Sequence, residues 1–269
     1  MKPFSYLVSY ALLLGLVGLA AEQANAAPSI EVSADIDHAP WDALLKKYVD
    51  ERGLVAYAKW KAAPADLSAL DAYLARFAVT PTTPAKGHVE IASLINAYNA
   101  FTIRWILDNY PAASIRTLDD SWGKARWSVG GRVVSLDEIE HQNLRPLYGW
   151  RVHAAIVCAA RSCPPLQAAA YTTENLGPLT EQAYRAWLAR DDLNRFDPAK
   201  GQVVVSPIFK WFQDDFTGAG ELSALLAKLG PEKHGVFFRA AKFKVDYIDY
   251  HWGLNDQTVL GQDYRHGSQ

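Results

Sequence analysis

Two cysteines, five residues apart, are the side chains of this sequence best suited to covalent chemistry. Cys158 and Cys163 lie in the stretch VHAAIVCAARSCPPL, and His153 precedes them. A thiolate is a nucleophile, and a histidine within reach can serve as its general base. Two thiols this close can instead form a disulfide if the chain turns between them. The stretch therefore predicts one of three states: a reactive Cys163, a Cys158–Cys163 disulfide, or two inert core thiols.

The expected local structure favours Cys163 as the reactive thiol. Residues 152–159 are apolar and long enough for a buried strand, in which His153 and Cys158 point to opposite faces. Cys163 precedes Pro164-Pro165, which is typical of a turn or of the start of a helix, and the positive end of a helix would stabilise a thiolate. His153 reaches Cys163 only if the chain folds back. The other candidate bases are His141, His234 and His251.

Two asparagines on a long apolar stretch are the second candidate feature. The stretch EIASLINAYNAFTIRWILDNYP predicts a largely buried central helix that ends before Pro111. Asn96 and Asn99 lie on its buried side, where an unbonded amide costs about 1–3 kcal/mol. They either tie neighbouring loops to the helix, or one of them is an oxyanion donor or orients a histidine. The predicted solvent strip of this helix is Ala97, Ala100, Arg104 and Asp108.

Charged residues near the C-terminus are secondary candidates. In SPIFKWFQDDF, Lys210 and Asp214 are spaced i,i+4 and predict a surface ion pair, with Asp215 beside them. Asp249, in DYIDYHWGLN, lies in a dense aromatic patch and could orient a histidine. The sequence has no paired-histidine metal motif, phosphate loop or Gly-x-Ser-x-Gly elbow. We therefore expect no metal and no cofactor.

The N-terminus has the pattern of a secretory signal peptide. Lys2 precedes an apolar run, and Ala24-Asn25-Ala26 suits signal peptidase, so residues 1–26 are expected to be removed. We expect an exported protein, periplasmic or secreted, with no stable membrane span after cleavage; an uncleaved anchor is the alternative. A net charge of −2 gives no basic excess for nucleic acid. The expected partner is a small-molecule or peptide ligand.

The pattern of elements predicts a single α+β domain over residues 41–255. The first half is mostly helical, and a small mixed sheet is expected to pack on the central buried helix. Residues 27–40 are predicted to be a short flexible N-terminal segment, and residues 256–269 a C-terminal tail. Helices are predicted over 41–53, 65–78, 90–110, 175–192 and 221–230, and strands over 131–134, 152–159, 201–208 and 245–255. Residues 54–62 are expected to be extended or a turn, and Ser135 with Glu138 forms a capping box.

Seven motifs, taken together, resemble the domain of unknown function 547 family. They span about Trp41 to Asn255 and read, in order, LVAY, INAYNAFTI, YPAASIRTL, VGGRVVSLDEIEHQNLR, RVHAAIVCAARSCPPLQAAAYT, VVVSPIFKWFQDDF and YIDYHWGLN. The chain has Ser93-Leu94 where the family usually has Phe-Trp, and His251 where it usually has Asp. The resemblance implies relatives but no reaction. The family's signature positions correspond to Asn96, Asn99, His153, Cys158, Ser162, Cys163, Pro164, Lys210 and Asp215.

Two classes of function follow from these residues. The first is a thiol-dependent enzyme, either hydrolase- or transferase-like with Cys163 as nucleophile, His153 as base and Asn96 or Asn99 as polar support, or a redox protein that uses Cys158 and Cys163 as a pair. The second is a non-catalytic envelope binding or structural protein whose cysteines form a structural disulfide. The secondary site candidates are Cys158, Ser162, Lys210 and Asp215.

Overall fold

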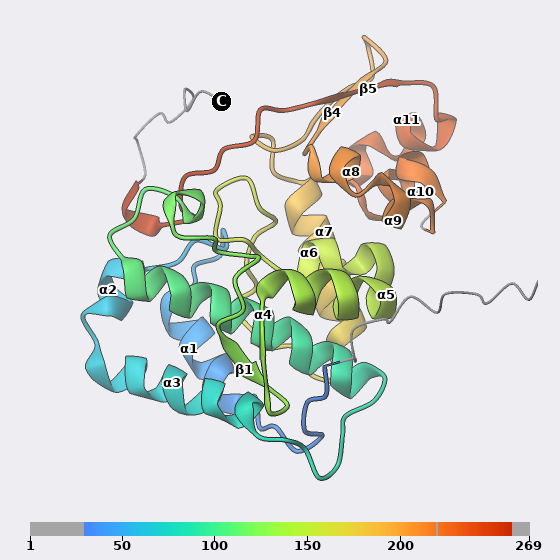
Figure 1. Cartoon of the computed structure of the whole chain (residues 1–269). Helices are drawn as coiled ribbons and strands as arrows, with labels where there is room; N and C mark the ends of the chain where they lie inside the picture. The colour runs from blue at the N-terminus through green and yellow to red at the C-terminus, as the bar shows by residue number, and fades with distance from the viewer. Residues whose placement is uncertain (1–29, 219, 260–269) are drawn as a thin grey trace, which may run out of the picture.

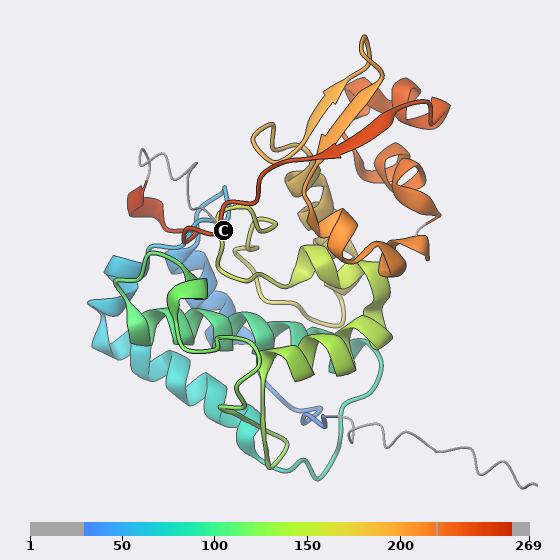
Figure 2. The same cartoon turned by 45° about the horizontal axis from the view of Figure 1, so that its top comes forward.

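The computed structural model describes residues 30–218 and 220–259 (Figures 1 and 2). The predicted signal peptide and the end of the C-terminal tail lie outside the described residues. The start of the chain that is described packs on the core: Ile30 and Val32 are buried, and the amide of Ala85 donates to the carbonyl of Val32 at 2.8 Å. In the described part of the chain, no helix combines the length and the apolar character that crossing a membrane requires.

The first half of the chain is helical. Its elements are α1 (Ala39–Tyr48), α2 (Tyr57–Lys61), α3 (Pro64–Ala78), α4 (His88–Asn109) and the 3-10 turn η1 (Ile115–Thr117). The predicted extended segment at residues 54–62 is wrong, because it contains α2. Tyr57 and Trp60 are both buried on one side of that helix. A helix of five residues is too short for its periodicity to be evident in the sequence.

A hairpin and a run of short helices follow. The elements are β1 (Trp127–Val129), β2 (Arg132–Val134), the π-helix η2 (Glu138–Leu144), α5 (Arg145–Tyr148), η3 (Gly149–Arg151), α6 (Val152–Ala155) and α7 (Leu176–Leu188). Gly130 and Gly131 both have positive φ, as a tight two-residue hairpin turn requires. Ser135 accepts a hydrogen bond from the amide of Glu138 at 3.0 Å, as the capping box predicts. The Glu138 carboxylate instead binds Arg132 at 2.6 Å.

The C-terminal part combines a three-stranded sheet with short helices. The elements are β3 (Arg195–Asp197), β4 (Gln202–Val205), α8 (Ile208–Trp211), α9 (Gln213–Thr217), α10 (Glu221–Leu229), η4 (Glu232–His234), α11 (Gly235–Ala240), β5 (Lys244–Tyr247) and η5 (Gln257–Val259). The central strand β4 is antiparallel to β3 and parallel to β5, so the sheet is mixed. The α+β class of the prediction is confirmed.

The central helix of the prediction is α4, and 15 of its 22 residues are buried. Figure 1 shows it running through the middle of the larger part of the molecule, with α1 and α3 below it. Tyr110 is extended because it precedes Pro111, and this ends the helix. The predicted solvent strip is wrong at Ala97 and Ala100, which are fully buried, because further segments cover that side of the helix.

Two hydrophobic clusters form the core. The larger surrounds α4, and the hairpin joins it through Trp127, which stacks on Phe101 of α4 with ring centroids 4.6 Å apart. The smaller includes Trp187 of α7, Phe209 of α8 and Val203 and Val205 of the mixed sheet. In Figure 2 the mixed sheet and α8 to α11 lie together at one end of the molecule. The hairpin is thus the sheet that contacts the central helix, and the mixed sheet covers the second cluster.

The last described segment returns from β5 to the start of the fold. After β5 the chain runs back across the molecule to the region of α2 (Figure 1). Val55 donates its amide to the carbonyl of Asn255 at 2.8 Å, and the Tyr57 hydroxyl donates to the Asn255 side chain at 2.9 Å. This segment crosses the cysteine loop on its way and therefore positions the candidate site.

Candidate functional site

Cys158 and Cys163 form a disulfide, with their Cα atoms 6.4 Å apart. The predicted strand over residues 152–159 is wrong. Val152 to Ala155 form the helical turn α6, and an extended stretch then leads to Cys158. No helix begins at Cys163, because the next helix of the chain is α7, at Leu176. The helix-end stabilisation expected for a Cys163 thiolate is therefore absent from this loop.

Asn99 explains why an extended segment follows α6 without belonging to a sheet. Its Nδ2 donates to the carbonyl of Ala155 at 2.9 Å, and its Oδ1 accepts the amide of Val157 at 2.9 Å. One side-chain amide thus satisfies the two backbone groups that a neighbouring strand would satisfy. Asn96 makes the same paired contact with the backbone of Tyr171, at 2.7 and 2.9 Å. Both asparagines tie later segments to α4.

The C-terminal segment holds the cysteine loop from the other side. The amide of Arg161 donates to the carbonyl of Gly253 at 2.7 Å, and the amide of Ser162 donates to the carbonyl of His251 at 3.2 Å. The Ser162 hydroxyl accepts the His251 amide at 2.9 Å. Ser162 is 2% exposed, so its hydroxyl fixes the loop and does not face solvent.

Two donors point at the sulfur of Cys163. The amide of Cys158 lies 3.2 Å from that sulfur, and the Tyr250 hydroxyl lies 3.1 Å from it. The same hydroxyl is 3.3 Å from the Cys158 sulfur. A disulfide carries no proton, so the phenol is the donor in both contacts. Burial, with the charge of Glu140, raises the pKa of Tyr250, and the hydroxyl therefore keeps its proton.

The two cysteines differ in exposure. Cys163 is 5% exposed and belongs to the main core, whereas Cys158 is half-buried. A reagent in solution is therefore expected to reach Cys158 more readily. The more protected sulfur is the one with two hydrogen-bond donors.

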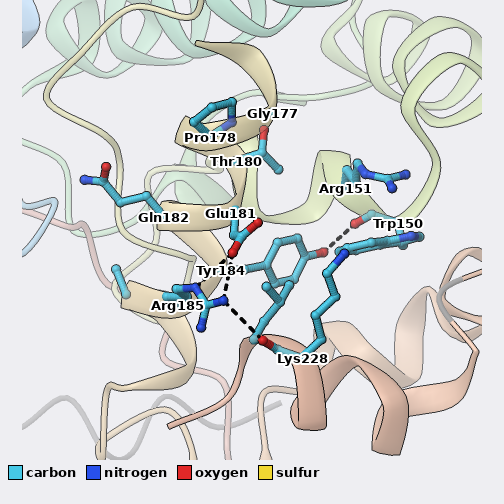
Figure 3. Close-up of a pocket in the computed structure, with 12 residues that line it drawn as sticks. Trp150, Arg151, Gly177, Pro178, Thr180, Glu181, Gln182, Tyr184, Arg185 and Lys228 are labelled. Atoms are coloured by element: carbon cyan, nitrogen blue, oxygen red, sulfur yellow. Dashed lines mark hydrogen bonds and ion pairs between the residues drawn. The ribbon is translucent and has the colours of Figure 1, made fainter. Parts of the chain in front are cut away.

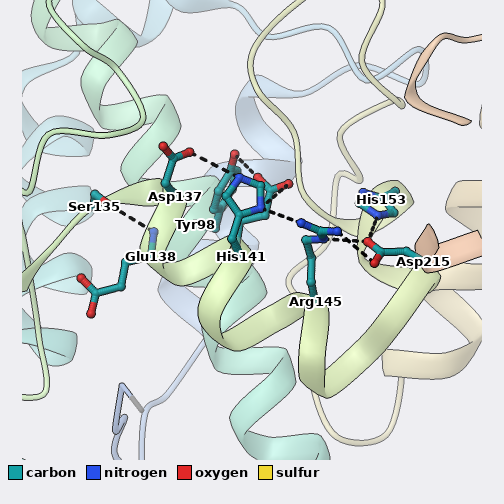
Figure 4. A network of polar contacts seen from close by, with 9 residues as sticks. Tyr98, Ser135, Asp137, Glu138, His141, Arg145, His153 and Asp215 are labelled. Atoms are coloured by element: carbon teal, nitrogen blue, oxygen red, sulfur yellow. Dashed lines mark hydrogen bonds and ion pairs between the residues drawn. The ribbon is translucent and has the colours of Figure 1, made fainter. Parts of the chain in front are cut away.

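His153 belongs to a separate polar network (Figure 4). Its Nε2 lies 2.7 Å from Oδ2 of Asp215, and Arg145 binds both oxygens of the same carboxylate at 2.7 and 3.0 Å. The ring stacks on Phe212 with centroids 4.3 Å apart. Arg145 also contacts His141 at 3.2 Å. No hydrogen bond joins His153 to Cys158 or Cys163, all of which lie in the described part of the chain.

The electrostatics of this network keep His153 neutral and Asp215 charged. Burial lowers the pKa of His153 to about 4, although the Asp215 carboxylate acts in the opposite direction. Burial by itself would raise the pKa of Asp215, but the hydrogen bonds from Arg145 and His153 outweigh it and lower that pKa. The arrangement is a bidentate arginine–carboxylate pair with a neutral histidine packed against it.

Lys210 lies apart from both groups. It is exposed, and its ammonium lies over the ring of Tyr247 at 5.7 Å from the centroid. The predicted ion pair with Asp214 does not form, because α8 ends at Trp211 and the chain breaks its helical spacing before α9 begins. Asp249 is exposed beside Tyr250.

A groove of about 810 Å³ lies between α7, η3 and the end of α10 (Figure 3). Arg151 lies over the Trp150 ring at 4.7 Å, and Arg185 binds Glu181 at 2.7 Å and the carbonyl of Lys228 at 3.2 Å. None of the sequence-predicted site residues lines this groove. Within residues 30–218 and 220–259, no cluster of three or more His, Cys, Asp or Glu side chains has the arrangement of a metal site.

The structure thus divides the predicted site residues into three groups, with Lys210 apart from all of them. Cys158, Cys163 and Ser162 form the loop, His153 and Asp215 form the polar network, and Asn96 and Asn99 bind backbone. Sequence reasoning missed Tyr250 and Arg145. The available signal for Tyr250 was its place in the aromatic stretch DYIDYHWGLN, which the motif pattern already included.

This α+β chain has a short-loop disulfide with a hydroxyl donor at its sulfurs. Residues 85–188 match the family described as "Protein of unknown function, DUF547", which supports the resemblance predicted from the motifs. The matched segment contains α4, both asparagines, His153 and the cysteine loop. No curated protein and no solved structure matches the chain.

Proposed function

We propose that the chain is an exported thiol–disulfide redox protein whose reactive group is the Cys158–Cys163 disulfide. The observation that carries the proposal is that the two cysteines differ in exposure and in the hydrogen-bond donors at their sulfurs. Cys158 is the more accessible, and Cys163 receives the Cys158 amide and the Tyr250 hydroxyl. Exchange is fastest when the attacked sulfur is accessible and the leaving thiolate is stabilised.

The exchange step follows from this difference. An external thiolate attacks the sulfur of Cys158 and forms a mixed disulfide with it. The Cys158–Cys163 bond breaks, and its electron pair remains on Cys163 as a thiolate. A second external thiolate then attacks the external sulfur of the mixed disulfide, the bond to Cys158 breaks, and Cys158 leaves as a thiolate while the two external sulfurs remain joined as a disulfide. Two electrons pass from the two external thiols to the protein, whose cysteines end reduced.

The redox form of the thiol hypothesis is better supported than the hydrolase or transferase form. A Cys–His nucleophile needs a free thiol within hydrogen-bond reach of the base. Here both sulfurs are joined to each other, and Nε2 of His153 is bonded to Asp215. Asn96 and Asn99 have both of their amide groups engaged by backbone.

Mixed-disulfide trapping tests the proposal. The Cys163→Ser protein, treated with glutathione disulfide, is expected to accumulate a stable adduct at Cys158, which intact-protein mass spectrometry detects. The Cys158→Ser protein is the matched control, and its buried Cys163 is expected to react much more slowly. Failure of Cys163→Ser to form an adduct would refute attack at Cys158.

A non-catalytic binding protein with a structural bridge is the second candidate, because backbone hydrogen bonds from residues 251–255 hold the loop. The equilibrium of the native protein with glutathione buffers separates the two functions. Structural disulfides have midpoint potentials below about −300 mV, and a redox protein is expected above that value. Export is tested on the expressed full-length chain: a mature N-terminus at Ala27 supports a cleaved signal peptide, and an intact N-terminus contradicts it.

A further inference from the structure

Arg116 is separated from the disulfide by the rings of Trp252 and Tyr250, and its charge has no acidic partner among the described residues. Its guanidinium lies over the ring of Trp252, 4.9 Å from the centroid, and among the described residues no carboxylate or carbonyl binds it. The turn that carries it is anchored to the same tryptophan, because the Ser114 hydroxyl donates to the carbonyl of Trp252 at 2.7 Å and accepts the Arg116 amide at 3.1 Å. The cation is therefore held in place and retains its in-plane N–H donors.

Trp252 connects Arg116 to the sulfurs through one further ring. Its centroid is 4.5 Å from that of Tyr250, whose hydroxyl contacts both cysteines. Trp211 stacks on Trp252 with an interplanar angle of 16° and is 49% exposed. Both tryptophan rings, one of which carries the guanidinium, therefore pack against the tyrosine that contacts the Cys158 sulfur. We call Arg116, Trp211 and Trp252 the aromatic–arginine patch.

We propose that the aromatic–arginine patch binds the carboxylate of a low-molecular-weight thiol or disulfide whose sulfur reacts at Cys158. This inference rests on the proposed redox function and names its substrate class. A guanidinium presents paired N–H groups that match a carboxylate, and contact with an aromatic face leaves those in-plane groups available. The two tryptophan rings offer apolar contact to the carbon chain between carboxylate and sulfur.

The reaction follows the exchange described above with the substrate oriented. In the reducing direction, the Cys158 thiolate attacks one sulfur of a carboxylate-bearing disulfide. The substrate S–S bond breaks, one half leaves as a thiolate, and the other half remains on Cys158. The Cys163 thiolate then attacks Cys158, re-forms the protein disulfide and releases the second half as a thiolate. Arg116 takes no part in electron transfer and acts only on binding.

Exchange rates with two disulfides test the inference. Reduced full-length protein is mixed with dithiodipropionate, which carries two carboxylates, or with bis-hydroxyethyl disulfide, which is neutral. Arg116→Gln is expected to slow the first reaction about two- to fivefold, the effect of one exposed charge contact, and to leave the second unchanged. Added salt is expected to slow the first reaction of the native protein and not the second.

The matched control is Arg151→Gln, because Arg151 also lies over a tryptophan ring, that of Trp150. It is expected to react like the native protein with both disulfides. Equal slowing of both reactions by Arg116→Gln would assign Arg116 to holding Trp252 in place and overturn the inference, as would no slowing at all. If the native protein exchanges with neither disulfide, the redox function itself fails.

Discussion

Replacement of Tyr250 by phenylalanine tests the leaving-group argument directly. The substitution keeps the ring that packs against Trp211 and Trp252, and it removes only the hydroxyl, which lies 3.1 Å from the Cys163 sulfur. When that sulfur becomes a thiolate, the lost contact is a hydrogen bond to a charged group, which contributes about 1.5–3 kcal/mol. The reduced protein loses this stabilisation, whereas the oxidised protein loses only a weak contact with neutral sulfur.

The midpoint potential of the disulfide is therefore expected to become more negative in Tyr250→Phe. About 30 mV corresponds to about 1.4 kcal/mol for a two-electron couple, so the expected shift is about 30–60 mV. The fraction oxidised is measured in glutathione buffers at a pH where the Cys163 thiol of the reduced protein is ionised. Tyr247→Phe is the control, because among the described residues the Tyr247 hydroxyl makes no hydrogen bond to either sulfur. An unchanged or more positive potential in Tyr250→Phe would refute the reasoning.

Three further predictions concern the rest of the site. Asp215→Asn weakens charged hydrogen bonds to Arg145 and is expected to lower the free energy of unfolding in urea by about 1.5–3 kcal/mol. The disulfide exchange rate of Asp215→Asn is expected to equal that of the native protein. A slower rate without a loss of stability would show that the polar network takes part in the exchange. His153 takes up a proton near pH 6.5 when unfolded and near pH 4 when folded, so stability is expected to fall as the pH drops through that window, by on the order of 3 kcal/mol. His153→Gln is expected to reduce this pH dependence of stability, and an unchanged slope would contradict the prediction. Part of the dependence is expected to persist in the variant, because burial also lowers the pKa of His38 to about 4. Asn99→Ala leaves the carbonyl of Ala155 and the amide of Val157 unbonded and is expected to lower the free energy of unfolding by about 2–5 kcal/mol. The control Gln142→Ala changes an exposed amide and is expected to alter it by less than about 0.5 kcal/mol.

The sequence predicted the features that depend on local periodicity. Apolar residues over most of a helical wheel identified α4 as the buried central helix, and the Gly-Gly pair identified the hairpin turn. The buried positions of Asn96 and Asn99 followed from the same wheel. Their partners did not, because Tyr171 and the stretch from Ala155 to Val157 lie more than 50 residues away along the chain.

The predicted strand at residues 152–159 failed for the same reason. An apolar run of that length fits a strand or a buried helical turn equally well, and the deciding contact comes from the side chain of Asn99. The pairing of His153 with Asp215 and the approach of Tyr250 to the sulfurs span 62 and about 90 residues. No spacing rule within one element reaches that far, so sequence reasoning identified the reactive side chains without their neighbours.

The return of the C-terminal segment has a consequence for the order of folding. The contact between Tyr57 and Asn255 closes a loop of 198 residues, and the length-dependent entropy of such a closure is roughly 5 kcal/mol. Contacts this distant in sequence form late and slow the folding rate. A chain that emerges N-terminus first can bury α4 long before residue 255 appears. The cysteine loop lacks its backbone hydrogen bonds to residues 251–255 until then, so the docking of the last segment is expected to complete the site after the rest of the core has formed.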